Sequence, residues 1–122
     1  MLTKSLEGRS LDLLTITVNS EREKIEEKPV IFLSARVHPG EVCSSFVIHG
    51  IIKFLLDSSP YSRKLLKNYV FKIIPMLNPD GVARGHYRFD TRGMEPYGLT
   101  VHCVMIMCGQ NKTYKFLLWV IK

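Results

Sequence analysis

A short apolar run, followed by a polar turn and a second apolar pattern of different period, constrains the fold of this chain most. Residues 30–35 read Val-Ile-Phe-Leu-Ser-Ala, which is apolar on both faces and predicts a buried parallel strand. Pro39 and Gly40 end that strand. From residue 42 to 57 apolar side chains recur at helical spacing. This order predicts an α/β fold with a site in the connecting turn.

His38 and Glu41 lie in that turn. An imidazole and a carboxylate held by a Pro-Gly bend can reach one cation together, and both are ligands of catalytic zinc sites. The spacing alone is a weak signal, because it also fits an ordinary polar turn. His49 does not extend the pair, since the helix past Glu41 carries it about 12 Å along the axis.

The next part of the chain predicts a second parallel strand beside the first. An amphipathic helix or turn at 62–67 is followed by an apolar strand at 69–77, which completes a right-handed crossover. The carboxyl ends of the two strands then open on the same edge of the sheet. Earlier in the chain, residues 11–18 alternate in part and predict an edge strand, and residues 19–28 predict a charged, solvated loop.

A second polar turn follows the second strand. Residues 78–81 read Asn-Pro-Asp-Gly, a sequence typical of turns. Its place at the strand's carboxyl end predicts that the basic residues after it, Arg84, Arg88 and Arg92, lie beside His38 and Glu41. The plain alternative is that these arginines are scattered over the surface.

Length and charge limit the classes of function. At 122 residues the chain is one domain at most, and it is small for a whole α/β enzyme, so we expect an incomplete fold. The formal net charge of +6 favours acidic partners. The basic residues are dispersed, without a run interleaved by aromatic residues, which argues against nucleic acid as the partner.

The cysteines and the apolar segments indicate the compartment. Cys43, Cys103 and Cys108 are odd in number and lack C-x-x-C spacing, so we expect a reducing compartment and no disulfide. No signal-peptide pattern and no apolar run of the ~20 residues needed to span a bilayer is seen. We therefore expect a cytoplasmic chain without a membrane partner.

From residue 94 the sequence changes character. Two apolar runs, 99–108 and 113–121, flank a Gly-Gln-Asn-Lys turn and predict a hairpin. We expect residues 94–122 to be a divergent apolar tail that adds to an open sheet edge or self-associates. We also expect the tail to leave the strand at 70–77 short of partners.

Taken together, the motifs resemble those of the zinc metallocarboxypeptidases, and within them the cytosolic carboxypeptidases that remove glutamates from tubulin. The resemblance covers about residues 6–93. The stretches that carry it are Gly8-Arg9-Ser10, the turn 35–41 with Ser44-Ser45-Phe46, the run 71–82 and Arg84-Gly85-His86-Tyr87-Arg88. The last of these, followed by an acidic residue and Arg92-Gly93, looks most similar to the member that removes branch-point glutamates.

The resemblance implies roles for particular residues. His38 and Glu41 match two of three zinc ligands, and Arg88 matches the catalytic arginine that polarises the scissile carbonyl. Arg84, Arg88 and Arg92 would bind substrate. The implied fold is the N-terminal part of a carboxypeptidase-like mixed, mainly parallel sheet with flanking helices. Implied partners are Zn²⁺ and glutamylated tubulin or other acidic tails, in the cytoplasm and also in the nucleus or on microtubules.

Three family features have no match in this sequence. After Arg92-Gly93 the family pattern requires an Asn-Arg pair that holds the substrate carboxylate, but the chain continues Met94-Glu95. The third zinc ligand and the catalytic glutamate are also unmatched, and the residues flanking His102 do not resemble those of the third ligand. We therefore divide the chain into residues 1–93, the N-terminal part of the catalytic domain, and the tail 94–122. We expect a truncated, inactive form that binds zinc weakly.

Two other functions remain open from the sequence. A non-catalytic basic module could hold an acidic polypeptide tail through the face of Arg84, Arg88 and Arg92 without cutting it. A generic α/β nucleotide-binding fragment is disfavoured because neither strand-to-helix turn has Gly-rich phosphate spacing.

Overall fold

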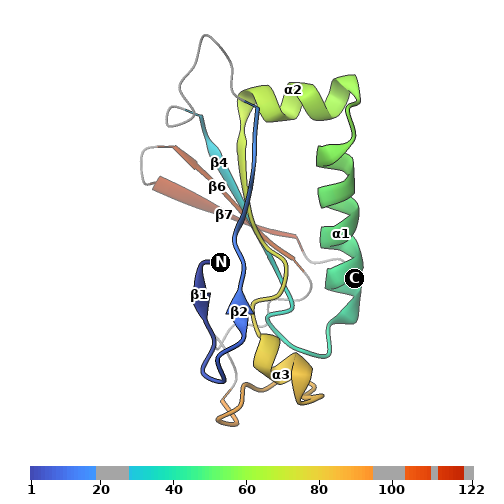
Figure 1. Cartoon of the computed structure of the whole chain (residues 1–122). Helices are drawn as coiled ribbons and strands as arrows, with labels where there is room; N and C mark the ends of the chain where they lie inside the picture. The colour runs from blue at the N-terminus through green and yellow to red at the C-terminus, as the bar shows by residue number, and fades with distance from the viewer. Residues whose placement is uncertain (19–27, 95–103, 111–112, 120–122) are drawn as a thin grey trace.

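The structure is a computed structural model that describes residues 1–18 and 28–94, together with the backbone of 104–110 and 113–119. Its elements in chain order, shown in Figure 1, are β1 (Thr3–Lys4), β2 (Ser10–Leu11), β3 (Leu14–Ile16), β4 (Val30–Ala35), α1 (Val42–Leu56), α2 (Pro60–Asn68), β5 (Val70–Ile74), α3 (Pro79–Ala83), β6 (Val104–Gln110) and β7 (Thr113–Trp119). The predicted loop at 19–28 lies outside the described residues, except for Lys28.

The main sheet has five strands in the order β3-β5-β4-β6-β7. Strands β4 and β5 run parallel, in a register from Val30 opposite Val70 to Ser34 opposite Ile74. The other neighbouring pairs are antiparallel. The mixed sheet is thus confirmed, but antiparallel pairs outnumber the parallel one among the described strands, against the expectation of a mainly parallel sheet. The expectation that the second strand lacks partners is wrong, because β5 lies between β3 and β4.

The crossover between β4 and β5 is the one that the sequence predicts. Helix α1 occupies the expected span, and α2 begins at Pro60, where Ser59 Oγ accepts a hydrogen bond from the Ser62 backbone N–H at 3.2 Å. Both helices lie on one side of the sheet, with α2 at the opposite end from α3 (Figure 1). The buried core between sheet and helices consists of Leu33, Ala35, Ile48, Leu55, Leu66, Phe71 and Ile73.

The predicted strand at 11–18 is divided in two. Strand β2 pairs with β1 in a separate two-stranded sheet, and β3 pairs with β5 as an edge strand of the main sheet. The turn between β1 and β2 is tight because Gly8 takes a φ of +79°, a conformation that glycine adopts readily. The second strand is shorter than the predicted 69–77, since β5 ends at Ile74, just before a proline that has no N–H to donate.

The predicted C-terminal hairpin is confirmed as β6 and β7. Strand β6 also pairs with β4, from Val30 opposite Gly109 to Ala35 opposite Val104, so the hairpin adds to an otherwise open edge of the sheet. Residues 99–103, including His102, lie outside the described residues. Among the described helices none is by itself long and apolar enough to span a membrane; α1 and α2 pass that test only as a pair bent by 95°.

Candidate metal and substrate site

The turn after β4 lies against the segment after β5. Backbone N–H groups of Leu77 and Asn78 donate to the carbonyl oxygens of Ala35 and Arg36 at 2.9 and 3.0 Å. These bonds continue the contact between the parallel strands beyond their last paired residues. The predicted meeting of the two polar turns at one edge of the sheet is therefore confirmed.

His38 and Glu41 face each other in this turn. His38 Nδ1 lies 2.7 Å from Glu41 Oε1, and the two side chains are only 1% and 15% exposed. The backbone holds the spacing, because the Glu41 N–H donates to the His38 carbonyl at 3.1 Å. Ser44, at the start of α1, donates its hydroxyl to the Glu41 carbonyl at 2.7 Å. The sequence thus brings two ligand-type side chains together in a nearly water-free position.

The donor chemistry of this pair fits a zinc ion. Imidazole nitrogen and carboxylate oxygen are both zinc ligands, and two ligand atoms about 2.0–2.2 Å from a tetrahedral ion stand about 3.4 Å apart. The Nδ1 to Oε1 separation of 2.7 Å would have to open by about 0.7 Å. In the part of the chain that the structure describes, no group of three or more His, Cys, Asp or Glu side chains could hold a metal ion. The described site therefore offers two candidate ligands.

Two glycines allow the segments to approach closely. The Gly40 N–H donates to the Tyr87 carbonyl at 2.8 Å, and a Cβ at Gly40 would lie 2.5 Å from Tyr87 Cδ2. A Cβ at Gly81 would clash with Cγ of Pro39. A larger residue at Gly40 would push the segment of Tyr87 away from the turn of His38, and one at Gly81 would push α3 away from Pro39 in the same turn. The close packing fixes the segment after β5 against the predicted ligands.

The three predicted arginines have different surroundings. Arg84 Nε lies 2.5 Å from a carboxylate oxygen of Glu7, and Arg92 Nη2 lies 2.8 Å from Asp90 Oδ2. Arg88 is half-buried and directly follows Tyr87, so the contact between Tyr87 and Gly40 places its backbone next to the turn. Among the three, Arg88 is the one that the backbone ties to the predicted zinc ligands.

The role of Asp80 was not predictable from the sequence. This buried carboxylate accepts hydrogen bonds from Ser5 Oγ at 2.6 Å, from Arg9 Nη1 at 2.9 Å and from the Glu7 backbone N–H at 3.1 Å. Burial would raise the pKa of Asp80, but these hydrogen bonds outweigh it and hold the pKa below its ordinary value. The network ties the small β1–β2 sheet to α3. The only signal in the sequence was that both Arg9 and Asp80 belong to family-like motifs.

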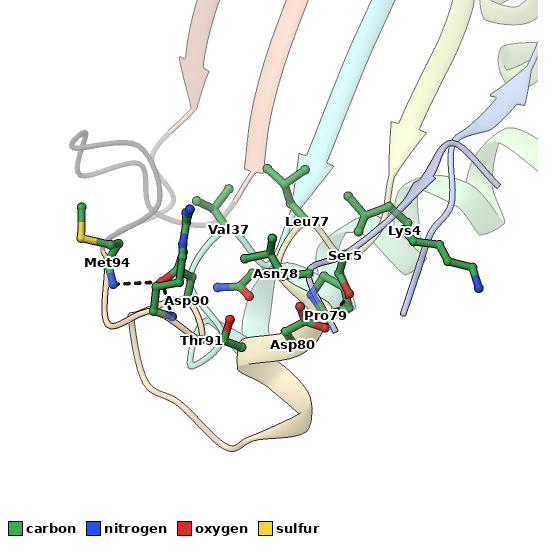
Figure 2. Close-up of a pocket in the computed structure, with 13 residues that line it drawn as sticks. Lys4, Ser5, Val37, Leu77, Asn78, Pro79, Asp80, Asp90, Thr91 and Met94 are labelled. Atoms are coloured by element: carbon green, nitrogen blue, oxygen red, sulfur yellow. Dashed lines mark hydrogen bonds and ion pairs between the residues drawn. The ribbon is translucent and has the colours of Figure 1, made fainter. Parts of the chain in front are cut away.

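A cavity of about 450 Å³ lies next to the turn, between the β1–β2 sheet, α3 and residues 90–94 (Figure 2). Val37 lines it, but the side chains of His38 and Glu41 do not. Asp90 accepts hydrogen bonds from the Met94 N–H and from Arg92, as Figure 2 shows for Met94. Burial alone would raise the pKa of Asp90, but the hydrogen bonds from Met94 and Arg92 have the larger effect. The pKa of Asp90 therefore lies below its ordinary value. The cavity is thus adjacent to the predicted zinc ligands without including their side chains, and it is lined by Arg92 of the predicted substrate residues.

Comparison with known proteins identifies relatives of this chain. Residues 1–111 match the zinc carboxypeptidase family. Cytosolic carboxypeptidase 6 of Mus musculus is 52% identical over 94 residues, which are 77% of this chain and 17% of that protein. Cytosolic carboxypeptidase-like protein 5 of Homo sapiens is 45% identical over 115 residues, 77% of this chain and 13% of that protein. The chain therefore spans less than a fifth of the length of these relatives.

A solved structure has the same fold. The metallo-carboxypeptidase from Burkholderia cenocepacia aligns with a TM-score of 0.68 and 31% sequence identity. The alignment covers 77% of this chain and 25% of that one. The arrangement of sheet and helices described above is thus shared with an enzyme whose chain is several times longer than the matched part.

Proposed function

Because the chain belongs to the zinc carboxypeptidase family, we propose that it forms part of the active site of a metallocarboxypeptidase that removes glutamates from glutamylated proteins such as tubulin. The observation that carries this proposal is the contact between His38 and Glu41 in the turn after β4, where His38 Nδ1 lies 2.7 Å from Glu41 Oε1. The names of the curated relatives support a cytoplasmic location for this chain. If its substrate is tubulin in microtubules, the chain would also be found on microtubules.

His38 and Glu41 would hold the zinc ion through Nδ1 and a carboxylate oxygen. A bound zinc ion supplies Lewis acidity, which lowers the pKa of water and polarises a carbonyl. The buried position of His38 excludes bulk water from one side of the site. Arg88 would place a permanent positive charge near the scissile carbonyl and stabilise the negative charge that develops on its oxygen.

The proposed substrate is a glutamate-rich protein tail. The net charge of +6 favours such a partner, because it attracts polyanions over distances of about a Debye length. Arg84, Arg88 and Arg92 would contact the substrate, with Arg88 nearest to the reacting bond. Arg84 and Arg92 already form ion pairs with Glu7 and Asp90, which lowers their contribution to substrate binding and to a non-catalytic basic face alike.

We expect the 122-residue polypeptide by itself to be inactive. A catalytic zinc site uses three protein ligands and one open position, whereas the described residues bring together two. Loss of a general base alone typically lowers a rate by about 10²–10⁴-fold. The proposed role of this chain is therefore tested by binding and by its own lack of turnover.

The experiment measures fluorescence anisotropy of a labelled peptide that ends in several glutamates. We expect the wild-type chain to bind it, Arg88→Ala to weaken binding severalfold, and Arg63→Ala to leave binding unchanged. Arg63 is the matched control because it is an exposed arginine on α2, at the other end of the sheet. Equal losses of affinity in both variants would show that the peptide binds through the net charge of the chain and not through Arg88 in particular. Glutamate release by the wild-type chain would contradict the expected inactivity.

A further inference from the structure

One arginine of the turn is neither a ligand nor a substrate residue in the proposal above. Arg36 folds its side chain back onto its own turn: Nε and Nη2 both donate to the Pro39 carbonyl, at 3.0 and 2.6 Å. The third nitrogen, Nη1, donates to Ser45 Oγ at 3.0 Å. The guanidinium therefore joins the middle of the turn to the first turn of α1, using the fork geometry that is specific to arginine.

The backbone of Arg36 is also held. Its N–H donates to Ser44 Oγ at 3.1 Å, and its carbonyl accepts the Asn78 N–H at 3.0 Å. Its φ is +56°, which makes it the only non-glycine residue with positive φ among those described. That conformation is disfavoured for a residue with a Cβ, and the side-chain contacts of Arg36 offset its cost.

Pro39 lies between His38 and Glu41, so a clamp on its carbonyl limits the movement of both side chains relative to each other. Ser44 accepts from the Arg36 N–H and donates to the Glu41 carbonyl, which couples the same arginine to the carboxylate's backbone. We infer that Arg36 is a positioning residue that holds the backbone of the turn, so that the His38 and Glu41 side chains stay within reach of one metal ion. This inference rests on the proposed function, because it concerns the same pair of zinc ligands.

The test compares zinc affinity with stability in variants of the 122-residue chain. Arg36→Gly removes the clamp and tolerates the positive φ, so its backbone is not strained. We expect its zinc affinity to fall about 10- to 100-fold, the usual effect of losing a group that orients metal ligands. Arg36→Lys keeps the charge without the fork and should give a smaller loss. Arg63→Ala is the matched control, because Arg63 Nε also braces a backbone carbonyl, that of Ser58, away from the site.

Calorimetric zinc titration gives the affinity, the absorption spectrum of bound Co²⁺ reports the ligand arrangement, and the urea midpoint gives the stability of the metal-free chain. A merely structural role would shift the urea midpoint and leave the affinity of the folded chain and the Co²⁺ spectrum unchanged, which would overturn the inference. Absence of zinc binding by the wild-type chain would instead refute the metal assignment in the proposed function. If Arg36→Gly does not fold, Arg36→Lys decides: an affinity within twofold of wild type overturns the positioning role, and a larger loss supports it.

Discussion

The turn after β4 and the β6–β7 hairpin are both attached to β4, but they are attached in different ways. The turn is held by contacts that depend on particular side chains, such as the fork from Arg36 to the Pro39 carbonyl and the contact of Gly81 with Pro39. The hairpin contacts that the structure describes are the backbone pairings of β6 with β4 and of β6 with β7. A ladder can form between many β-prone sequences, whereas the turn requires specific residues. Among the described atoms, the turn therefore depends on particular side chains, and the backbone of the hairpin covers an edge of β4.

The largest loss of stability is expected when the close approach in the turn region is blocked. Gly81→Ala places a Cβ against the Pro39 ring, whose rigidity prevents it from moving aside, and should cost about 2–3 kcal/mol of unfolding free energy. Gly50→Ala is the matched control: a Cβ at Gly50, on α1, would have no neighbour within 4 Å. This control should stabilise the chain by up to about 1 kcal/mol. Urea unfolding measures both, and equal effects would show that the close approach of Gly81 to Pro39 is not what stabilises the turn.

A smaller loss is expected from Asp80→Asn. This change removes the negative charge that accepts from Ser5, Arg9 and the Glu7 backbone, and should cost about 1–2 kcal/mol near neutral pH. Because the folded-state pKa of Asp80 is lowered, its stabilisation is fully present above the unfolded-state pKa of about 3.9 and is lost as pH falls through the folded-state value. Urea midpoints from pH 7 to pH 3 should therefore converge for wild type and Asp80→Asn. A constant difference would show that the charge is not what stabilises the network.

The smallest effect on global stability is expected from changes in the hairpin. Amides of β6 and β7 should exchange with solvent faster than those of β4 and β5, because β7 forms one edge of the described sheet. We expect the wild-type chain to self-associate at tens of micromolar through that edge, and Leu117→Lys to reduce this association, since charges on edge strands oppose pairing. Equal protection of β7 and β5 in a soluble monomer would show that the hairpin is as firmly specified as the turn.

Much of the site region could be predicted from the sequence because its signals are local. The strand at 30–35, the helix from residue 42 and the His38–Glu41 spacing each follow from periodicity and turn chemistry within a few residues. The parallel crossover then brought the second turn to the same edge. The Asp80 network could not be predicted, because it joins residues more than 70 positions apart, and no local pattern encodes such a contact.

The sheet neighbours were harder to predict for a related reason. Which edge of the sheet β3 or β6 joins depends on which edges the other strands leave open. In addition, the alternation of apolar and polar residues in 11–18 does not show where the chain leaves the sheet. The division of that run into β2 and β3 follows from the tight turn at Gly8, which directs Ser10–Leu11 back onto β1. The role of Arg36 was likewise hidden, because a positive φ and a folded-back side chain are not visible in sequence.

The central claim is that His38 and Glu41 form the metal-binding pair of this chain, and calorimetric titration with Zn²⁺ tests it most directly. We predict weak binding by the wild-type chain, loss of that binding in His38→Ala, and unchanged binding in His49→Ala, the matched control on the exposed face of α1. Tight, stoichiometric zinc binding that His38→Ala leaves unaffected would contradict the claim.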